Sequence, residues 1–331
     1  MTPDLANAQA SGEKRRASSP RRAFILAVKI AISAGLIWLI LSKVEFGDLR
    51  ARLFSPHVAP LVGAFAVALL QVVVVTWRFR RIVTAIGQSI GFAAALVIGI
   101  IGIFFNQSLP STIGGDAVRI WRLARAGMPL GGAVNSVLLD RITALIAILL
   151  MIAVSLPALI SMANNKAPVY AFATVALAGV LSAALVIAVG KLPAPLLRFR
   201  MFGALQGLLA DLRRLVMHPP VAVPVLGAAI VNHALTAAVV FGLAVAYEAP
   251  IGLWACLVLV PPVMLVAVVP ISIAGWGVRE GAMITAFGLI GITAGDALVV
   301  SVAFGIVNIL LGLPGGLVFL VTNGKSKRKQ N

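Results

Sequence analysis

Length, composition and charge exclude an ordinary water-soluble protein. The chain has 331 residues, of which 61% are hydrophobic and 11% are charged, whereas soluble globular domains contain about 45–50% apolar and about 25% charged residues. A soluble core of this size cannot bury so much apolar surface, but a lipid bilayer removes the need to do so.

The sequence contains repeated apolar stretches of about 20 residues, which is the length needed to cross a hydrocarbon layer of ~30 Å. They predict an all-α, polytopic membrane helix bundle with about eight hydrophobic segments. The predicted segments are residues 23–41, 58–77, 90–109, 131–158, 169–190, 222–246, 251–269 and 296–322, with a short additional segment at 280–291. Residues 194–217 predict an amphipathic helix on the membrane surface. We expect residues 1–22 to form a disordered basic tail, 23–322 the transmembrane domain and 323–331 a second basic tail.

The net charge of +17 is distributed between and beside the apolar stretches. This is the pattern of cytoplasmic loops in membrane proteins, so we expect no nucleic acid as a partner. Most Lys and Arg residues fall on one side if both termini are cytoplasmic, which predicts a multi-pass protein of the cytoplasmic membrane. The single Cys256 allows no intramolecular disulfide.

That orientation requires two chain reversals. Residues 90–125 must begin and end on the cytoplasmic face, and residues 251–291 must begin and end on the opposite face. We therefore predict two broken, re-entrant hairpins, whose non-helical backbone needs protein or a water-filled cavity around it.

The two predicted reversals resemble each other in sequence. Residues 110–119 (PSTIGGDAVR) and 270–279 (PISIAGWGVR) are identical at five of ten aligned positions. They would approach from opposite sides of the membrane, as expected for an inverted repeat with interrupted helices around a central site. Chance similarity between two glycine- and isoleucine-rich turns is the alternative.

Each reversal combines turn-forming residues with charge. The predicted turn residues are Pro110, Gly114, Gly115, Pro270, Gly275 and Gly277, because glycine and proline permit a reversal. A helix that starts there favours an anion at its N-terminus, and Arg119 and Arg279 are suited to binding a phosphate. The alternative is that these residues only shape a tight turn.

Further charged residues lie in apolar surroundings, where an isolated charge costs roughly 2.5–3.5 kcal/mol on insertion scales. They are Asp116, Asp140, Arg141 and Glu280. Asp140 and Arg141 project about 100° apart on a helix, so we expect each to have a separate partner. Static structural ion pairs are the alternative to a binding site.

Other polar residues have weaker signals. His233, beside Asn232, is expected to form a hydrogen bond with a neighbouring helix, and a proton relay is the alternative. Arg78, Arg80 and Arg81 follow Trp77 and are predicted to anchor the helix at the membrane interface, with contact to lipid head groups as the alternative. No His/Cys cluster has metal-ligand spacing, and we predict no metal or cofactor.

Three blocks resemble the lysylphosphatidylglycerol synthase transmembrane region, also called the flippase-like domain family. They are residues 104–119 (FFNQSLPSTIGGDAVR), 136–141 (SVLLDR) and 270–281 (PISIAGWGVREG). The resemblance implies movement of phospholipids or related amphiphiles between leaflets. It also places Asn106 in a family motif with the charged residues already named. The chain ends at Asn331, so the aminoacyl-transfer activity of two-part family members is not expected.

The predicted function is therefore lipid translocation, with an anionic or zwitterionic phospholipid or a polyprenyl- or hopanoid-type lipid as substrate. Arg119 and Arg279 would hold the phosphate near the midplane, and Asp116 and Glu280 would balance charge or couple to protons. Expected partners are membrane lipids, the anionic inner leaflet and a separate lipid-synthesising enzyme. The alternatives are a membrane enzyme or subunit acting on lipid or polyprenyl phosphates, and a small-solute transporter or membrane complex subunit.

Overall fold

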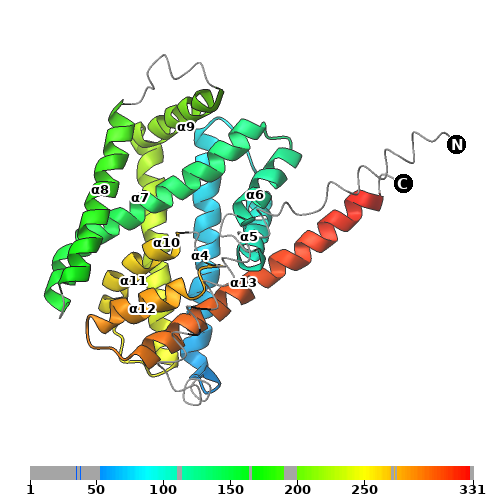
Figure 1. Ribbon diagram of the computed structural model, residues 1–331. Coiled ribbons are helices and arrows are strands. Elements are labelled where there is room, and N and C mark those ends of the chain that lie inside the picture. The colour runs from blue at the N-terminus through cyan, green and yellow to red at the C-terminus, as the bar shows by residue number, and fades with distance from the viewer. Residues whose placement is uncertain are drawn as a thin grey trace, which may run out of the picture.

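The computed structural model describes residues 53–109, 114–163, 166–189, 200–269 and 274–328, together with Gly35, Trp38 and Ser272. These residues form ten helices and no strand, which confirms the predicted all-α class. The predicted N-terminal tail and, apart from Gly35 and Trp38, the predicted first span at 23–41 lie outside the described residues. In chain order the helices are α4 (Val58–Ala85), α5 (Phe92–Ser108), α6 (Gly114–Arg125), α7 (Leu130–Met162), α8 (Ala167–Val189), α9 (Arg200–Met217), α10 (Pro219–Ala246), α11 (Leu253–Ala267), α12 (Val278–Gly288) and α13 (Ala294–Arg328) (Figure 1).

Four of these helices are long and apolar enough to cross a bilayer: α4, α7, α10 and the Ala294–Thr322 part of α13. Helix α4, with 28 residues, extends over roughly 42 Å at 1.5 Å per residue. Helices α5 and α11 are apolar but shorter, with 17 and 15 residues. The short apolar helices are those that precede the two predicted reversals.

Helices α4 and α10 lie antiparallel at the centre of the bundle (Figure 1). The backbone N–H of His57 donates to the Ala246 carbonyl over 2.8 Å at one end of the pair. Further along, Gln71 Nε2 donates to Thr236 Oγ1 over 2.6 Å. Between these bonds Gly242 faces Ala64, whose Cβ would lie 3.0 Å from a Cβ added at Gly242, so glycine permits the close approach.

Helices α5 and α6 form the first hairpin. The backbone N–H of Gly115 donates to Asn106 Oδ1 over 3.0 Å, and one turn later Arg119 lies against Gly102. Leu123, a further turn along α6, is buried in the same hydrophobic cluster as Ala95 of α5. Residues later in α6 thus contact residues earlier in α5, so the two helices are antiparallel.

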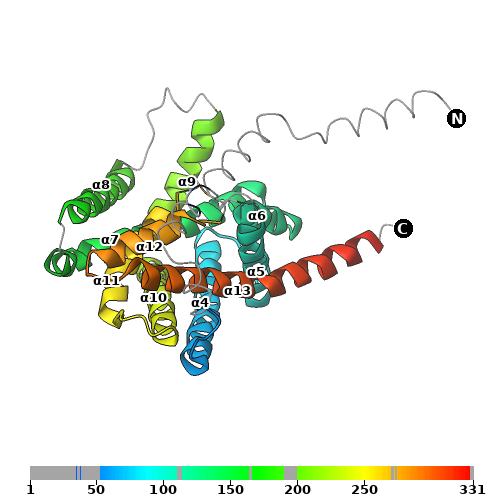
Figure 2. The same ribbon diagram turned by 60° about the horizontal axis from the view of Figure 1, so that its bottom comes forward.

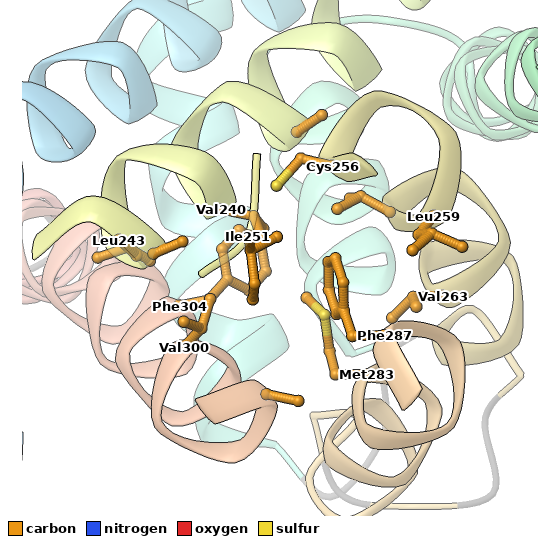
Figure 3. Packing of buried hydrophobic residues seen from close by; sticks show 14 of the residues in the cluster. Val240, Leu243, Ile251, Cys256, Leu259, Val263, Met283, Phe287, Val300 and Phe304 are labelled. Carbon is orange, nitrogen blue, oxygen red and sulfur yellow. The ribbon is translucent and has the colours of Figure 1, made fainter. Parts of the chain in front are cut away.

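Helices α11 and α12 form the second hairpin. Its connection contains three residues with positive φ: Ala274 (50°), Gly275 (80°) and Gly277 (85°). Glycine adopts this conformation without a steric penalty, so Gly275 and Gly277 suit the connection in which they lie. Figure 3 shows Met283 and Phe287 of α12 within the cluster that includes Leu259 and Val263 of α11.

The helices α4–α7 and α10–α13 follow the same order and pack in the same way. In each group the first helix contacts the second, the second and third form a hairpin, and the third contacts the fourth. Across the groups α5 contacts α13 and, correspondingly, α11 contacts α7. Helices α4 and α10 also have the same length, 28 residues.

Helices α8 and α9 lie outside this arrangement, and the C-terminal part of α13 projects away from the bundle (Figure 2). Helix α9 buries Leu212 and Leu215 in a cluster with Ile82, and it exposes Arg213 and Arg214. The described part of the predicted amphipathic segment is therefore an amphipathic helix. Helix α13 continues to Arg328, into the predicted C-terminal tail.

Candidate functional site

A cavity of about 440 Å³ lies between α4, α5, α6, α7, α10 and α13. Its walls are mostly aliphatic, as expected between membrane helices, but a band of polar and charged side chains interrupts them. These polar lining residues are Gln71, Thr76, Arg78, Asn106, Arg119, Asp140, Arg141, Asn232, His233 and Asn308.

Asp140 is the centre of the charged part of the cavity. Its Oδ1 accepts hydrogen bonds from Arg78 Nε at 3.0 Å and Nη2 at 2.8 Å. Its Oδ2 accepts from both terminal nitrogens of Arg119 at 3.2 Å. The guanidinium of Arg119 also lies 4.3 Å from the ring centre of Phe79, which adds a cation–π interaction. Three helices, α4, α6 and α7, are joined by this carboxylate.

Arg141 pairs with a different carboxylate. Its Nε donates to Asp116 Oδ2 over 2.8 Å and its Nη2 donates to Asp116 Oδ1 over 2.9 Å. Asp116 also lies 3.6 Å from Arg119 Nη1. The prediction that Asp140 and Arg141 have separate partners is therefore confirmed. Half of the Arg141 side chain is exposed, whereas Asp140 is buried.

We call Arg78, Asp116, Arg119, Asp140 and Arg141 the arginine–aspartate cluster. It contains three guanidinium groups and two carboxylates, which leaves a surplus of one positive charge. Among the described residues, the buried atoms Arg78 Nη1 and Arg119 Nε have no hydrogen-bond partner. Leaving a buried donor unpaired costs about 1–3 kcal/mol, so an acceptor that reached these two donors would be stabilised by them.

Uncharged groups complete the lining. The buried Asn232 Oδ1 has no hydrogen-bond partner in the described part of the chain, which offers an acceptor within the cavity. His233 Nε2 lies 3.0 Å from the Ala144 carbonyl of α7, as predicted. Asn106 lines the cavity, but its Oδ1 already accepts from the Gly115 N–H. Through this hydrogen bond, Asn106 holds the start of α6 against α5.

Arg279 and Glu280 form a separate cluster at the start of α12. Arg279 Nη2 donates to Glu280 Oε1 over 2.5 Å, and Glu280 Oε2 accepts from the Gly277 N–H over 2.5 Å. The guanidinium lies between Trp276 and Phe304, 4.8 and 5.7 Å from their ring centres. Ser301 Oγ contacts both charged groups. This cluster has balanced charge.

The structure thus brings together four of the predicted charged residues and leaves two apart. Neither Arg279 nor Glu280 lines the cavity that contains Arg119. Of the two arginines predicted to hold the phosphate, Arg119 lines this cavity and Arg279 does not. Glu280 follows Arg279 directly and neutralises it, whereas Arg119 has its closest carboxylate, Asp140, on α7.

Two of the predicted turn residues of the first hairpin lie where a new helix begins. Gly114 and Gly115 are helical and begin α6. A Cβ on Gly115 would overlap the Gly102 carbonyl and Asn106 Oδ1, so this glycine is needed for close packing of α5 and α6. Pro110 and Pro270 lie outside the described residues.

Sequence reasoning missed Arg78. It was predicted to anchor α4 at the interface with Arg80 and Arg81, but it is 3% exposed and bound to Asp140. Arg80 and Arg81 are exposed. The available signal was helical spacing, because Arg78 follows the cavity-lining Gln71 by seven residues, two helical turns, and so lies on the same face.

Comparison with known proteins agrees with the motif blocks. The family described as the lysylphosphatidylglycerol synthase TM region matches residues 26–316. No curated protein matches the chain. The match covers both helical hairpins, the cavity and the long apolar helices α4, α7 and α10, together with most of the apolar part of α13, and it indicates an integral membrane protein of lipid metabolism or transport. The chain belongs to the lysylphosphatidylglycerol synthase transmembrane-region family and is a multi-pass membrane protein.

Proposed function

We propose that this protein is a lipid translocase that moves a lipid with a phosphate-containing head group between the two leaflets of the cell membrane. The observation that carries the proposal is the surplus positive charge of the arginine–aspartate cluster inside a cavity between membrane helices. An anionic or zwitterionic phospholipid, or a polyprenyl- or hopanoid-type lipid with such a head group, is the proposed substrate.

The chemistry of the cavity fits the barrier to lipid movement. A charged head group cannot enter hydrocarbon without compensating contacts. Arg78 Nη1 and Arg119 Nε are buried donors that have no partner among the described residues. When the cavity opens to admit a head group, they would supply charge-assisted hydrogen bonds to phosphate oxygens. Asn232 Oδ1 would accept from a hydroxyl or ammonium group. The lipid chains would remain in the bilayer, beside the aliphatic walls of the cavity.

The proposal includes an inverted repeat of α4–α7 and α10–α13, with two re-entrant hairpins and both termini in the cytoplasm. It is supported by the matched helix order, the antiparallel α4–α10 pair and the short hairpin helices. Relative movement of two inverted halves would expose the cavity to each side in turn.

The two halves would then have different tasks. Arg119 and Arg279 occupy matching positions in the hairpins, but within the described residues Arg119 has a buried unpaired donor and Arg279 has none. We propose that the first hairpin binds the head group. Arg279, held by Glu280, Trp276 and Phe304, would instead keep the second hairpin rigid.

Replacing Arg119 with glutamine is expected to reduce lipid translocation at least about tenfold, because each 1.4 kcal/mol of lost interaction lowers an equilibrium or a rate by that factor. Asp140 keeps Arg78 as a partner, so the variant should fold. The measurement is dithionite quenching of fluorescently labelled phosphatidylglycerol in proteoliposomes. Arg213→Gln, on the exposed face of α9, is the matched control. Equal rates for Arg119→Gln and wild type would reject the proposed site.

Replacing Glu280 with glutamine should lower the stability of the protein and leave translocation nearly unchanged, which is the reverse of the result expected for Arg119→Gln. It leaves the buried Arg279 charge without its carboxylate, so we expect a lower unfolding temperature in detergent. Translocation per folded molecule should stay within about twofold of wild type, since a twofold change corresponds to well under 1 kcal/mol. Ser301→Ala removes only a neutral contact of the same cluster and serves as the control. Loss of transport in a Glu280→Gln protein with unchanged stability would indicate that Arg279 and Glu280 take part in substrate binding.

A further inference from the structure

A second arginine-rich feature lies further along α6, outside the cavity. Arg122 Nη2 donates to Thr322 Oγ1 of α13 over 2.7 Å. Thr322 is the last residue of the apolar Ala294–Thr322 stretch. Arg122 is therefore placed where the hydrocarbon layer should give way to lipid head groups, the depth at which Trp and basic residues are enriched.

Aromatic rings hold the basic groups of this feature. The Arg122 guanidinium lies 5.2 Å from the ring centre of Phe319 and 5.5 Å from that of Trp121. Arg125 lies 5.0 Å from the Trp121 ring centre. Trp121 is 38% exposed, so an indole face and two cations are available at one point of the surface. We call Trp121, Arg122, Arg125 and Phe319 the interfacial arginine site.

No carboxylate neutralises the interfacial arginine site within the described part of the chain. The ion pairs of the described residues include neither Arg122 nor Arg125. The buried Arg122 Nε also has no hydrogen-bond partner among these residues. Two positive charges held by rings are suited to a phosphodiester, which carries one negative charge and oxygens that accept hydrogen bonds.

We infer that the interfacial arginine site docks the phosphate of an anionic phospholipid, from the leaflet that meets the C-terminal end of α13. A ring-held guanidinium loses little freedom on binding, and the exposed Trp121 offers an apolar face to the lipid backbone. The inference that a lipid phosphate binds at this site does not depend on the proposed transport function.

Its consequence for transport rests on the proposed function. Arg119, Arg122 and Arg125 occur at intervals of three residues along α6, which is a rise of about 4.5 Å per step. A phosphate docked at Arg125 and Arg122 is thus about one to two helical turns from Arg119 in the cavity. The interfacial arginine site would load the head group into the cavity.

The test is quenching of Trp121 fluorescence by brominated lipids in the reconstituted full-length protein. Vesicles of phosphatidylcholine contain the same mole fraction of either brominated phosphatidylglycerol or brominated phosphatidylcholine. The difference between wild type and Trp121→Phe isolates the contribution of Trp121. We expect brominated phosphatidylglycerol to associate at least threefold more strongly than brominated phosphatidylcholine, and we expect Arg122→Gln/Arg125→Gln to abolish this preference.

Two controls do not require the double variant to fold. Arg81→Gln removes a single arginine 5.4 Å from the Trp77 ring at the end of α4, and the preference at Trp121 should survive it. In wild type, raising NaCl from 0.05 to 0.5 M should reduce the preference, because salt screens exposed charges. This second measurement does not depend on the folding of the double variant.

The outcomes separate docking from translocation. No preference in wild type, or a preference that survives the double substitution or high salt, overturns the docking site. Displacement of brominated phosphatidylglycerol by millimolar inorganic phosphate would overturn the lipid as ligand in favour of a soluble anion. Preference at Trp121 retained in Arg119→Gln supports docking even if no lipid is translocated, in which case only the proposed function fails.

Discussion

Replacing Asp140 with asparagine is expected to lower the free energy of unfolding by about 3–5 kcal/mol, the range for breaking a buried ion pair from one side. Asp140 is the carboxylate shared by Arg78 and Arg119. Its loss leaves the buried Arg119 with only the more distant Asp116, and it leaves the buried Arg78 with no ion-pair partner among the described residues. We expect a markedly lower unfolding temperature in detergent and a lower yield of monodisperse protein, both measured by tryptophan fluorescence and size-exclusion chromatography.

A second substitution tests the cause of that loss. Adding Arg78→Gln to Asp140→Asn restores the net charge of the arginine–aspartate cluster, so the double variant should be more stable than Asp140→Asn alone. Asp211→Asn, in the partly buried contact with Asn135, is the control for loss of a carboxylate between helices. An unchanged unfolding temperature for Asp140→Asn would mean that the cluster does not hold α4, α6 and α7 together.

Replacing Gly315 with valine is expected to destabilise the protein by at least about 3 kcal/mol, the upper part of the range for overpacking. A Cβ at Gly315 would overlap the backbone carbonyl of Ile100, and backbone cannot rotate away as a side chain can. Helices α5 and α13 would have to separate, which would also disturb the cavity wall formed by Ile103 and Leu311. The measurement is the folded yield and the unfolding temperature.

The matched control is a glycine with free space. A Cβ at Gly227 of α10 would meet nothing within 4 Å. Gly227→Ala should therefore be neutral or stabilising, by up to about 1 kcal/mol, because alanine has the higher helix propensity. Gly315→Ala should instead destabilise the protein. Two alanine substitutions with the same sign would show that propensity, and not contact between α5 and α13, decides the stability at Gly315.

Much of the helical architecture could be predicted from the sequence, because apolar stretches long enough to span a bilayer have few alternatives to helix. The predicted stretches at 131–158 and 222–246 lie within α7 and α10. The prediction for 58–77 ended eight residues before α4 does. The prediction followed the apolar stretch, whose length is limited by the thickness of the bilayer. The helix itself continues through arginine residues, because arginine is also a good helix former.

The charged site was only partly predictable. Insertion energetics indicated that Asp140 and Arg141 need partners, and helix geometry indicated that the partners differ. The same geometric argument does not hold at Arg279 and Glu280, which are neighbours and do pair. Glu280 lies in the first turn of α12 and bends back to the Gly277 N–H, where the long Arg279 side chain can reach it. Which helix faces which, and hence the place of Arg78, depends on tertiary packing that spacing alone does not specify.

The surplus guanidinium charge of the cavity also bears on the permeability of the membrane. A hydrated, polar passage between helices would be a potential leak for protons and metal cations down their electrochemical gradients. A fixed positive charge in a region of low dielectric constant repels such ions far more strongly than it would in bulk water. The cavity would therefore attract an amphiphile's anionic group while resisting dissipation of the ion gradients on which an energised membrane depends.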